Sequence, residues 1–248
     1  MQTVPIDRMR IDAPAREARE LVVFALGCSA VAAAAAIAIV RWPAPLYANA
    51  TFIASAWYVL GFKLAYMLGV PLAWMRWRGY RMADVLGRWR SSWRAWIAIV
   101  LAVAAGLALN IQHVGPIRNL VAGDPPWSPI VLGVILPLVA AAIPEELAFR
   151  ALLQTRLEKV GGRLVAIGVS TALFALWHLP SRFLLATGVE GTAGDLGSIL
   201  VGTALPVVIV GLVLAAIWDR WRTFPVLVAL HFAIDLLPSL RQALGGTF

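Results

Sequence analysis

Charged residues are scarce in this chain, and cysteine is nearly absent. Only 14% of the 248 residues are charged and 61% are hydrophobic, whereas a soluble domain has about 25% charged and about 45–50% apolar residues. This scarcity excludes an ordinary soluble domain. The single cysteine, Cys28, excludes an intrachain disulfide and a zinc site built from cysteines. With a mean hydropathy of +0.81, the composition is that of a membrane protein.

Long apolar runs predict seven membrane-spanning helices, because a span needs about 20 predominantly apolar residues. The stretch 76–94 is rich in Trp and Arg, so it suits an interfacial helix better than a span and could supply an eighth helix. The predicted fold is therefore all-α, a polytopic transmembrane helix bundle of about seven to eight spans. The predicted spans are 21–40, 51–75, 95–112, 129–150, 163–179, 196–218 and 224–240.

The basic residues lie between the apolar runs, as they do in the cytoplasmic loops of membrane proteins. The net charge of +8 therefore indicates the lipid bilayer, and not nucleic acid, as the expected partner. Seven spans with the N-terminus inside place sixteen of the 21 basic residues on the inner side and four outside, and Lys63 falls within a span. We expect a multi-pass protein of the cell's inner membrane, with a cytoplasmic N-terminus and an outer C-terminus.

The stretch "IPEELAFRALL" (Ile143–Leu153) places two glutamates in apolar surroundings. Glu146 and Arg150 are four residues apart, so they share one face of a helix and can pair. Glu145 is rotated by about 100° from its neighbour and is expected to remain free. Pro144 should kink the helix and open a wet pocket. The alternative is that these residues only cap a span at the membrane interface.

Two more units repeat the same four-residue spacing on later spans. His178 follows Phe174 by four residues, and Asp235 follows His231 by four. Each unit alone has a structural alternative, since a single histidine near a span end often packs at the interface. A carboxylate one turn from a histidine can fix the tautomer of its ring. Because the units lie on different spans, they can converge, and a carboxylate with two histidines can activate water.

These residues resemble the three motifs of the CPBP family, the CAAX-protease and bacteriocin-processing group of intramembrane proteases, which includes the Ras-converting type of CAAX endopeptidase. The resemblance covers about residues 129–240 and implies hydrolysis of a peptide bond in a buried site reached by water. The motifs are EExxxR (Glu145, Glu146 and Arg150), FxxxH (Phe174 and His178) and HxxxN or HxxxD (His231 and Asp235).

The resemblance also implies roles for these residues. Glu145 and His178 would activate water, and His231 and Asp235 would stabilise the oxyanion. An ionised Asp only accepts hydrogen bonds, so we expect His231 to be the donor and Asp235 to orient its ring. The supporting residues would be Glu146, Arg150 and Phe174.

No cofactor is required by this pattern, yet zinc is possible. Glu145, His178 and His231 could hold Zn²⁺ with a fourth position left for water. The sequence contains no HExxH motif, and a metal-free glutamate mechanism uses the same residues. The sequence leaves both mechanisms open.

The predicted organisation has a basic N-terminal segment (1–20), accessory spans (21–128), a CAAX-protease-like catalytic core (129–240) and a C-terminal tail (241–248). The span limits place Glu145 toward the inner side and His178 near the outer end, more than one helical turn apart in depth. A membrane-associated protein or peptide is the expected substrate.

Two other functions compete with a peptidase. Intramembrane carboxylates and histidines also serve as proton relays, so a proton-coupled membrane transporter is the alternative. Carriers usually contain repeated halves, whereas the polar set of this chain is confined to its second half. A non-catalytic membrane scaffold is the third interpretation.

Overall fold

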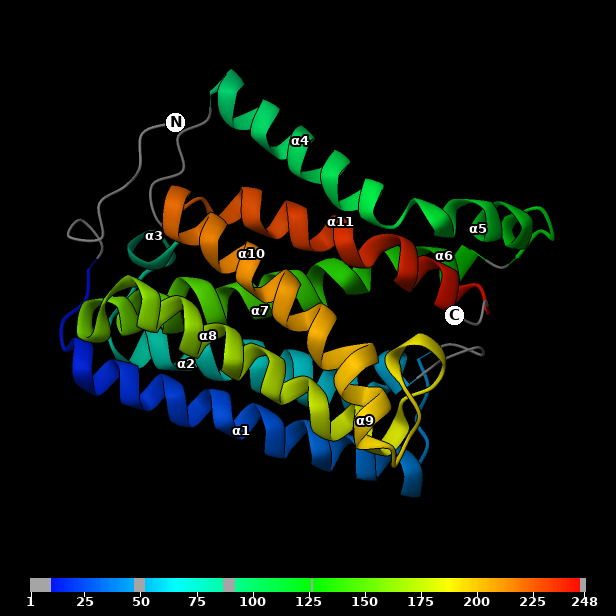
Figure 1. Ribbon diagram of the computed structural model, residues 1–248, viewed down its shortest axis with the longest axis horizontal. Coiled ribbons are helices and arrows are strands. Elements are labelled where there is room, and N and C mark those ends of the chain that lie inside the picture. Colours follow the sequence, from blue (N-terminus) through cyan, green and yellow to red (C-terminus); the bar gives the residue numbers. More distant parts are fainter. Residues whose placement is uncertain (1–9, 47–51, 87–91, 126, 246–248) are drawn as a thin grey trace.

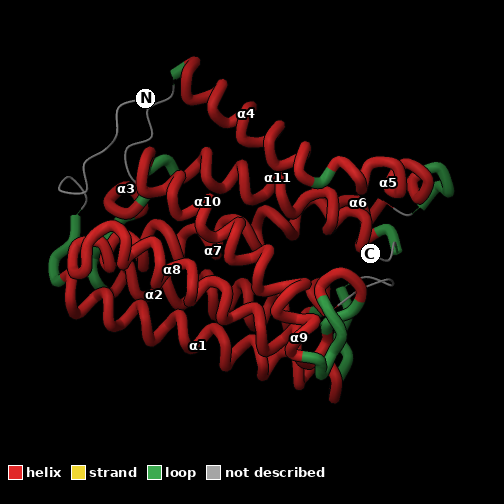
Figure 2. Tube along the Cα trace, viewed as in Figure 1, coloured by secondary structure: helices red, strands yellow, loops and turns green. Residues whose placement is uncertain are grey.

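The computed structural model describes residues 10–46, 52–86, 92–125 and 127–245. Within these ranges every regular element is a helix (Figure 2), which confirms the predicted all-α bundle. Arg88, Arg90 and parts of the predicted N-terminal segment and C-terminal tail lie outside the described residues.

The first half of the chain supplies two long helices and a bent pair. Its elements are α1 (Pro14–Arg41), the π-helical segment η3 (Trp57–Leu68), α2 (Gly69–Trp77), α3 (Met82–Val85), α4 (Trp93–Leu109) and α5 (Val114–Val121). Figure 1 shows α1 and α2 on one side of the bundle and α4 on the opposite side.

The second half contains the segments that carry the three motifs. Its elements are α6 (Trp127–Leu136), the π-helical segment η5 (Pro137–Ala142), α7 (Ile143–Glu145), the π-helical segment η6 (Glu146–Gln154), α8 (Thr155–Leu185), α9 (Leu196–Ile199), the π-helical segment η8 (Leu200–Ala204), α10 (Leu205–Trp221) and α11 (Phe224–Ala243). Pro144, which was predicted to kink the helix, lies in continuous helix with π-helical segments on either side.

Five helical segments of the described residues are long and apolar enough to cross a membrane, or six if α4 and Ile111–Val121, bent by 63°, form one span. The longest, Trp127–Leu185, has 59 residues and would extend about 90 Å if straight, three times the bilayer core of about 30 Å. It turns back at Gly162 (Figure 1), whose φ of 79° suits glycine. The count is lower than the predicted seven to eight spans for two reasons. The folded segment is counted once, and the described residues of 76–94, the predicted eighth helix, contain only the short α3 between the ends of α2 and α4.

The two arms of the folded segment correct the predicted span limits. Helical structure continues past the predicted end at residue 150 into α8, and α8 continues past residue 179 to Leu185. Glu145 therefore lies near the middle of the first arm rather than at its inner end. The predicted difference in depth between Glu145 and His178 was wrong because it depended on these span limits.

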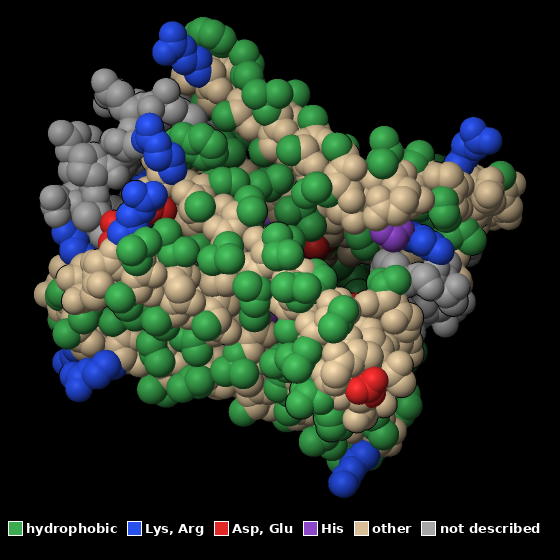
Figure 3. Space-filling view, in the orientation of Figure 1, with side chains coloured by type: hydrophobic (Ala, Val, Ile, Leu, Met, Phe, Trp, Pro, Cys, Tyr) green, Lys and Arg blue, Asp and Glu red, His purple; other side chains and the backbone are tan. Residues whose placement is uncertain are grey.

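Ion pairs join several segments that the sequence places on the same side of the membrane. The buried Arg156 Nε lies 3.1 Å from Glu17 Oε2 at the start of α1, and Arg163 Nε lies 2.7 Å from Asp219 Oδ2 near the end of α10. Figure 1 shows these helix ends together, and Figure 3 shows a largely hydrophobic surface between basic side chains toward the ends of the molecule. These contacts support the predicted order in which the spans cross the membrane. That this side is the cytoplasmic one stays a prediction.

Close packing of α4 on α11 depends on a glycine. Gly106 is buried, and a Cβ atom at this position would lie 2.6 Å from the Cβ of Ala233. That distance is too short for two methyl groups, so a larger residue would push α4 away from α11.

We expect Gly106→Ala to lower the free energy of unfolding by about 1–3 kcal/mol, as overpacking does. Thermal unfolding in detergent, followed by circular dichroism, measures the effect. The matched control is Gly168→Ala on α8, where no atom lies within 4 Å of the added Cβ. Equal unfolding midpoints for the two variants would show that α4 does not pack as described.

Candidate active site

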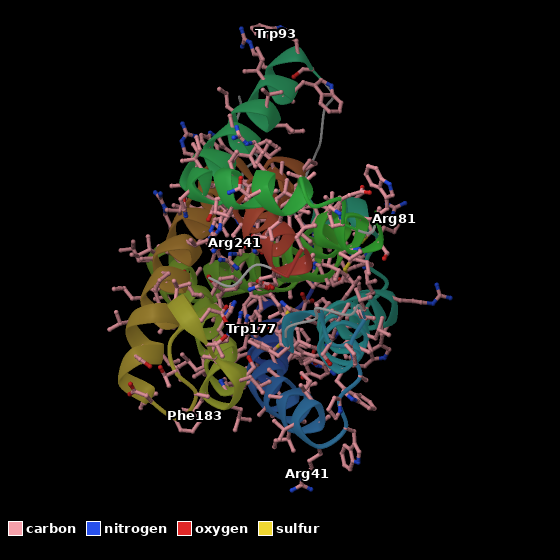
Figure 4. The ribbon with its side chains drawn as sticks, turned by 90° about the vertical axis from the view of Figure 1, so that its right-hand side faces the viewer. Arg41, Arg81, Trp93, Trp177, Phe183 and Arg241 are labelled. Atoms are coloured by element: carbon pink, nitrogen blue, oxygen red, sulfur yellow. The ribbon has the colours of Figure 1, made fainter. Side chains whose placement is uncertain are left out.

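A cavity of about 320 Å³ brings together the four side chains that the sequence proposed as catalytic. Glu145 enters from α7, His178 from α8, and His231 and Asp235 from α11. Lys63 of η3 lines the same cavity. Figure 4 shows Trp177, another lining residue, in the interior of the bundle. The three motifs therefore converge, as the sequence predicted.

Glu146 is the central buried anion of the site. Its Oε2 lies 3.5 Å from Arg150 Nε, and both side chains are fully buried, so the predicted pair is confirmed. Its Oε1 lies 2.6 Å from His231 Nδ1, a contact that the sequence did not predict. Arg150 also packs over Phe174, with Cζ 4.0 Å from the ring centroid. Glu146 thus joins the first motif to the third, and Arg150 joins it to the second.

Glu145 is not free, and this prediction was wrong. Lys63 Nζ donates to Glu145 Oε1 as a buried ion pair, and Glu145 Oε2 lies 3.8 Å from His231 Nε2. The error arose because the partner comes from η3, a span that the sequence treated as accessory. The available signal was a single lysine within an apolar span, since charges at membrane depth are usually functional.

The ring of His178 is fixed by the backbone one turn earlier. Its Nδ1 lies 2.8 Å from the carbonyl oxygen of Phe174, and a carbonyl only accepts, so Nδ1 carries the proton. In the neutral ring Nε2 then keeps a lone pair. The ring packs against Trp177, with centroids 3.6 Å apart. The FxxxH spacing therefore leaves one defined proton acceptor on a residue that lines the cavity.

The ring of His231 lies between two acids. Asp235 Oδ2 lies 3.3 Å from Nε2, and Glu146 contacts Nδ1, so Asp235 is placed to orient the ring as expected. A neutral imidazole has only one N–H. Donation to both carboxylates therefore requires the protonated ring.

The zinc set considered from the sequence does not fit this arrangement. Both nitrogens of His231 face carboxylates, Nδ1 of His178 is bonded to a carbonyl, and the ammonium of Lys63 contacts Glu145. Across the described ranges, no group of three or more His, Cys, Asp or Glu residues is arranged to hold a metal ion. Glu145, His178 and His231 therefore do not fit a zinc site in this arrangement.

Arg182, which follows the predicted span 163–179, is buried and lines the cavity. Its guanidinium donates to the hydroxyl of Tyr58 at 3.0 Å and to Glu190 Oε1 at 3.3 Å. The carboxylate of Glu190 comes from the loop between α8 and α9. This pair connects the loop to the helix that carries His178.

The fold and the site define a helical membrane protein with buried carboxylates and imidazoles around one cavity. A family model described as Type II CAAX prenyl endopeptidase Rce1-like matches residues 126–237, a range that includes all three motifs. The match confirms the resemblance to CAAX proteases of the CPBP family and supports an intramembrane protease function. No curated protein and no solved structure matches the chain.

The burial of Glu146 generates a stability prediction. Glu146→Gln keeps the shape of the side chain but leaves Arg150 without its anion, so we expect a loss of about 3–5 kcal/mol in the free energy of unfolding. Thermal or denaturant unfolding in detergent measures the loss.

The control is the same chemical change at an exposed pair, Asp12→Asn, where Arg10 and Asp12 side chains are 46% and 52% exposed. We expect no measurable shift there. A Glu146→Gln variant as stable as the Asp12→Asn variant would mean that the buried pair does not hold the motifs together.

Proposed function

We propose that this protein is an intramembrane endopeptidase that hydrolyses a peptide bond of a membrane-associated protein or peptide. The observation that carries the proposal is the shared cavity of Glu145 and His178. Glu145 offers a carboxylate, and His178 offers Nε2 as a second acceptor, because its Nδ1 is committed to a carbonyl. Two acceptors beside one cavity can orient a water molecule and remove its proton.

The reaction proceeds by direct attack of this water. Glu145 takes one proton while the water oxygen forms a bond to the scissile carbonyl carbon, and His178 Nε2 accepts from the remaining O–H. The carbonyl oxygen becomes an oxyanion. The proton on Glu145 then passes to the amide nitrogen, the C–N bond breaks, and a carboxyl group and an amine leave the site.

His231 is the donor to the oxyanion. Its Nε2 lies between Glu145, at 3.8 Å, and Asp235, at 3.3 Å. When Glu145 takes a proton it loses its charge and attracts this N–H less, so the N–H becomes available to the new oxyanion. Asp235 and Glu146 keep the ring in place, which makes the donor preorganised.

Apolar walls support a membrane-associated substrate. Away from the charged residues, the cavity is lined by α6, η5, α10 and α11 with side chains such as Leu136, Pro137, Val207 and Ile234. A lipid chain or an apolar peptide segment can lie against these walls, where burial of apolar surface favours binding. The prenylated C-terminal peptide named by the matching family is the first substrate class to test.

The test uses the purified full-length chain in liposomes with an internally quenched peptide ending in a CAAX sequence, in farnesylated and unlipidated forms. We expect a new peptide end by mass spectrometry. Glu145→Gln and His178→Ala should each lower the cleavage rate by about 10²- to 10⁴-fold, the usual contribution of general acid–base catalysis.

The control is Lys159→Met at an exposed position, which should cleave at the wild-type rate. Cleavage of the farnesylated form alone would assign lipidated substrates, and cleavage of both would assign a peptide requirement only. Proton movement across the vesicles without any new peptide end, or full activity of Glu145→Gln, would overturn the peptidase proposal.

Asp235 gives a separate prediction. An Asn at this position still accepts from His231 and can also donate to the oxyanion, so Asp235→Asn should retain activity within about tenfold. Asp235→Ala removes the orienting group and should lose activity by about 100-fold, the upper end of the 10- to 100-fold range seen for outer-shell partners of metal-binding histidines. Equal activities of the two variants, measured with the same peptide, would mean that Asp235 does not orient the ring.

A further inference from the structure

Lys63 is the buried charge of the site that the family match leaves without a role. It lies on η3, outside the matched residues 126–237, and is 4% exposed. An isolated ammonium in an apolar span is costly. The cost is offset here by a contact with one particular carboxylate, that of Glu145.

The ammonium is held in a defined place. Nζ lies 4.2 Å from the ring centroid of Trp177, 5.7 Å from Tyr58 and 5.8 Å from Phe62. Cation–π contacts within about 6 Å stabilise a desolvated cation. Lys63 donates to Glu145 Oε1, whereas Oε2 points toward His231. The ammonium therefore fixes which oxygen of Glu145 is engaged and which is available.

The other cations around the cavity pair with carboxylates other than Glu145. Arg150 pairs with Glu146, and Arg182 pairs with Glu190. The protonated form of His231 faces Glu146 and Asp235 more closely than it faces Glu145. Other ionisable groups that face Glu145 or Lys63 include Cys28 of α1, Tyr58 of η3 and His178 of α8. Among the described residues, Lys63 is thus the cation that lies closest to the carboxylate of Glu145.

We propose that Lys63 is a positioning residue for the Glu145 base, which it keeps ionised and oriented in the apolar bundle. This inference rests on the proposed function. A carboxylate removed from water favours its neutral form unless a cation lies close by, and a neutral Glu145 cannot take a proton from water. Proton transfer moves the negative charge from Glu145 to the oxyanion, and the ammonium of Lys63 keeps the cavity electrically balanced throughout.

The test measures kcat and KM of Lys63→Met with the quenched peptide that the wild type cleaves. We expect kcat to fall by about tenfold or more, within the range of general-base effects, with KM changed by less than about twofold. Lys63→Arg, which keeps the charge, should recover most of kcat. Lys159→Met is the matched control and should equal the wild type.

A double-mutant cycle separates positioning from a general structural role. Because Lys63 acts through Glu145, Lys63→Met should cost less than about twofold when added to Glu145→Gln. If Lys63→Met does not fold, Lys63→Gln takes its place, because it keeps a hydrogen-bond donor but no charge. Unfolding midpoints identify variants that lose activity only through loss of fold.

Wild-type kcat in folded Lys63→Met or Lys63→Gln would overturn this inference and leave the peptidase proposal intact. Equal losses in the presence and absence of the Glu145 carboxylate would also overturn it, because Lys63 would then act independently of the base. Failure of the peptidase proposal gives a different result, in which the wild type itself shows no cleavage dependent on Glu145.

Discussion

Two adjacent carboxylates buried in an apolar bundle impose the constraint on which the rest of the site depends. Glu145 and Glu146 are 3% and 0% exposed, so bulk water solvates neither carboxylate. Each buried negative charge therefore requires a cation beside it. Arg150 forms an ion pair with Glu146 from the next helical turn, and Lys63 forms an ion pair with Glu145 from η3. Because Lys63 lies on η3, a span from the first half of the chain contributes a side chain to the site formed by the second half.

The local backbone fits this requirement. η5 and η6 are π-helical and flank α7, and turns of this kind are frequent at functional sites because they change the direction of side chains along a helix. Pro137 begins η5 and Pro144 lies in α7 between the two segments, and neither proline has a backbone N–H to donate. The two glutamates can consequently face different partners, with Glu146 toward Arg150 and His231 and Glu145 toward Lys63 and the cavity.

Contacts within one helix could be predicted from the sequence, whereas contacts between helices could not. Spacing of four residues correctly paired Glu146 with Arg150 and placed Asp235 beside His231, because those relations depend only on helix geometry. The contacts of Glu145 with Lys63 and of Glu146 with His231 join residues 82 and 85 positions apart, and no periodicity encodes such contacts. The span limit at residue 150 failed because Arg150 was taken as the end of the span, whereas its charge pairs with buried Glu146 and the helix continues into α8.

The central claim is that the carboxylate of Glu145 and Nε2 of His178 act on the same scissile bond inside this cavity. A cryo-electron microscopy structure of the Glu145→Gln variant in lipid nanodiscs, with an uncleaved substrate peptide bound, tests it most directly. The account predicts that the scissile carbonyl lies between residue 145 and His178, with Lys63 beside the substituted side chain. A scissile carbonyl bound outside the cavity, or separated from both residues by lipid, would contradict it.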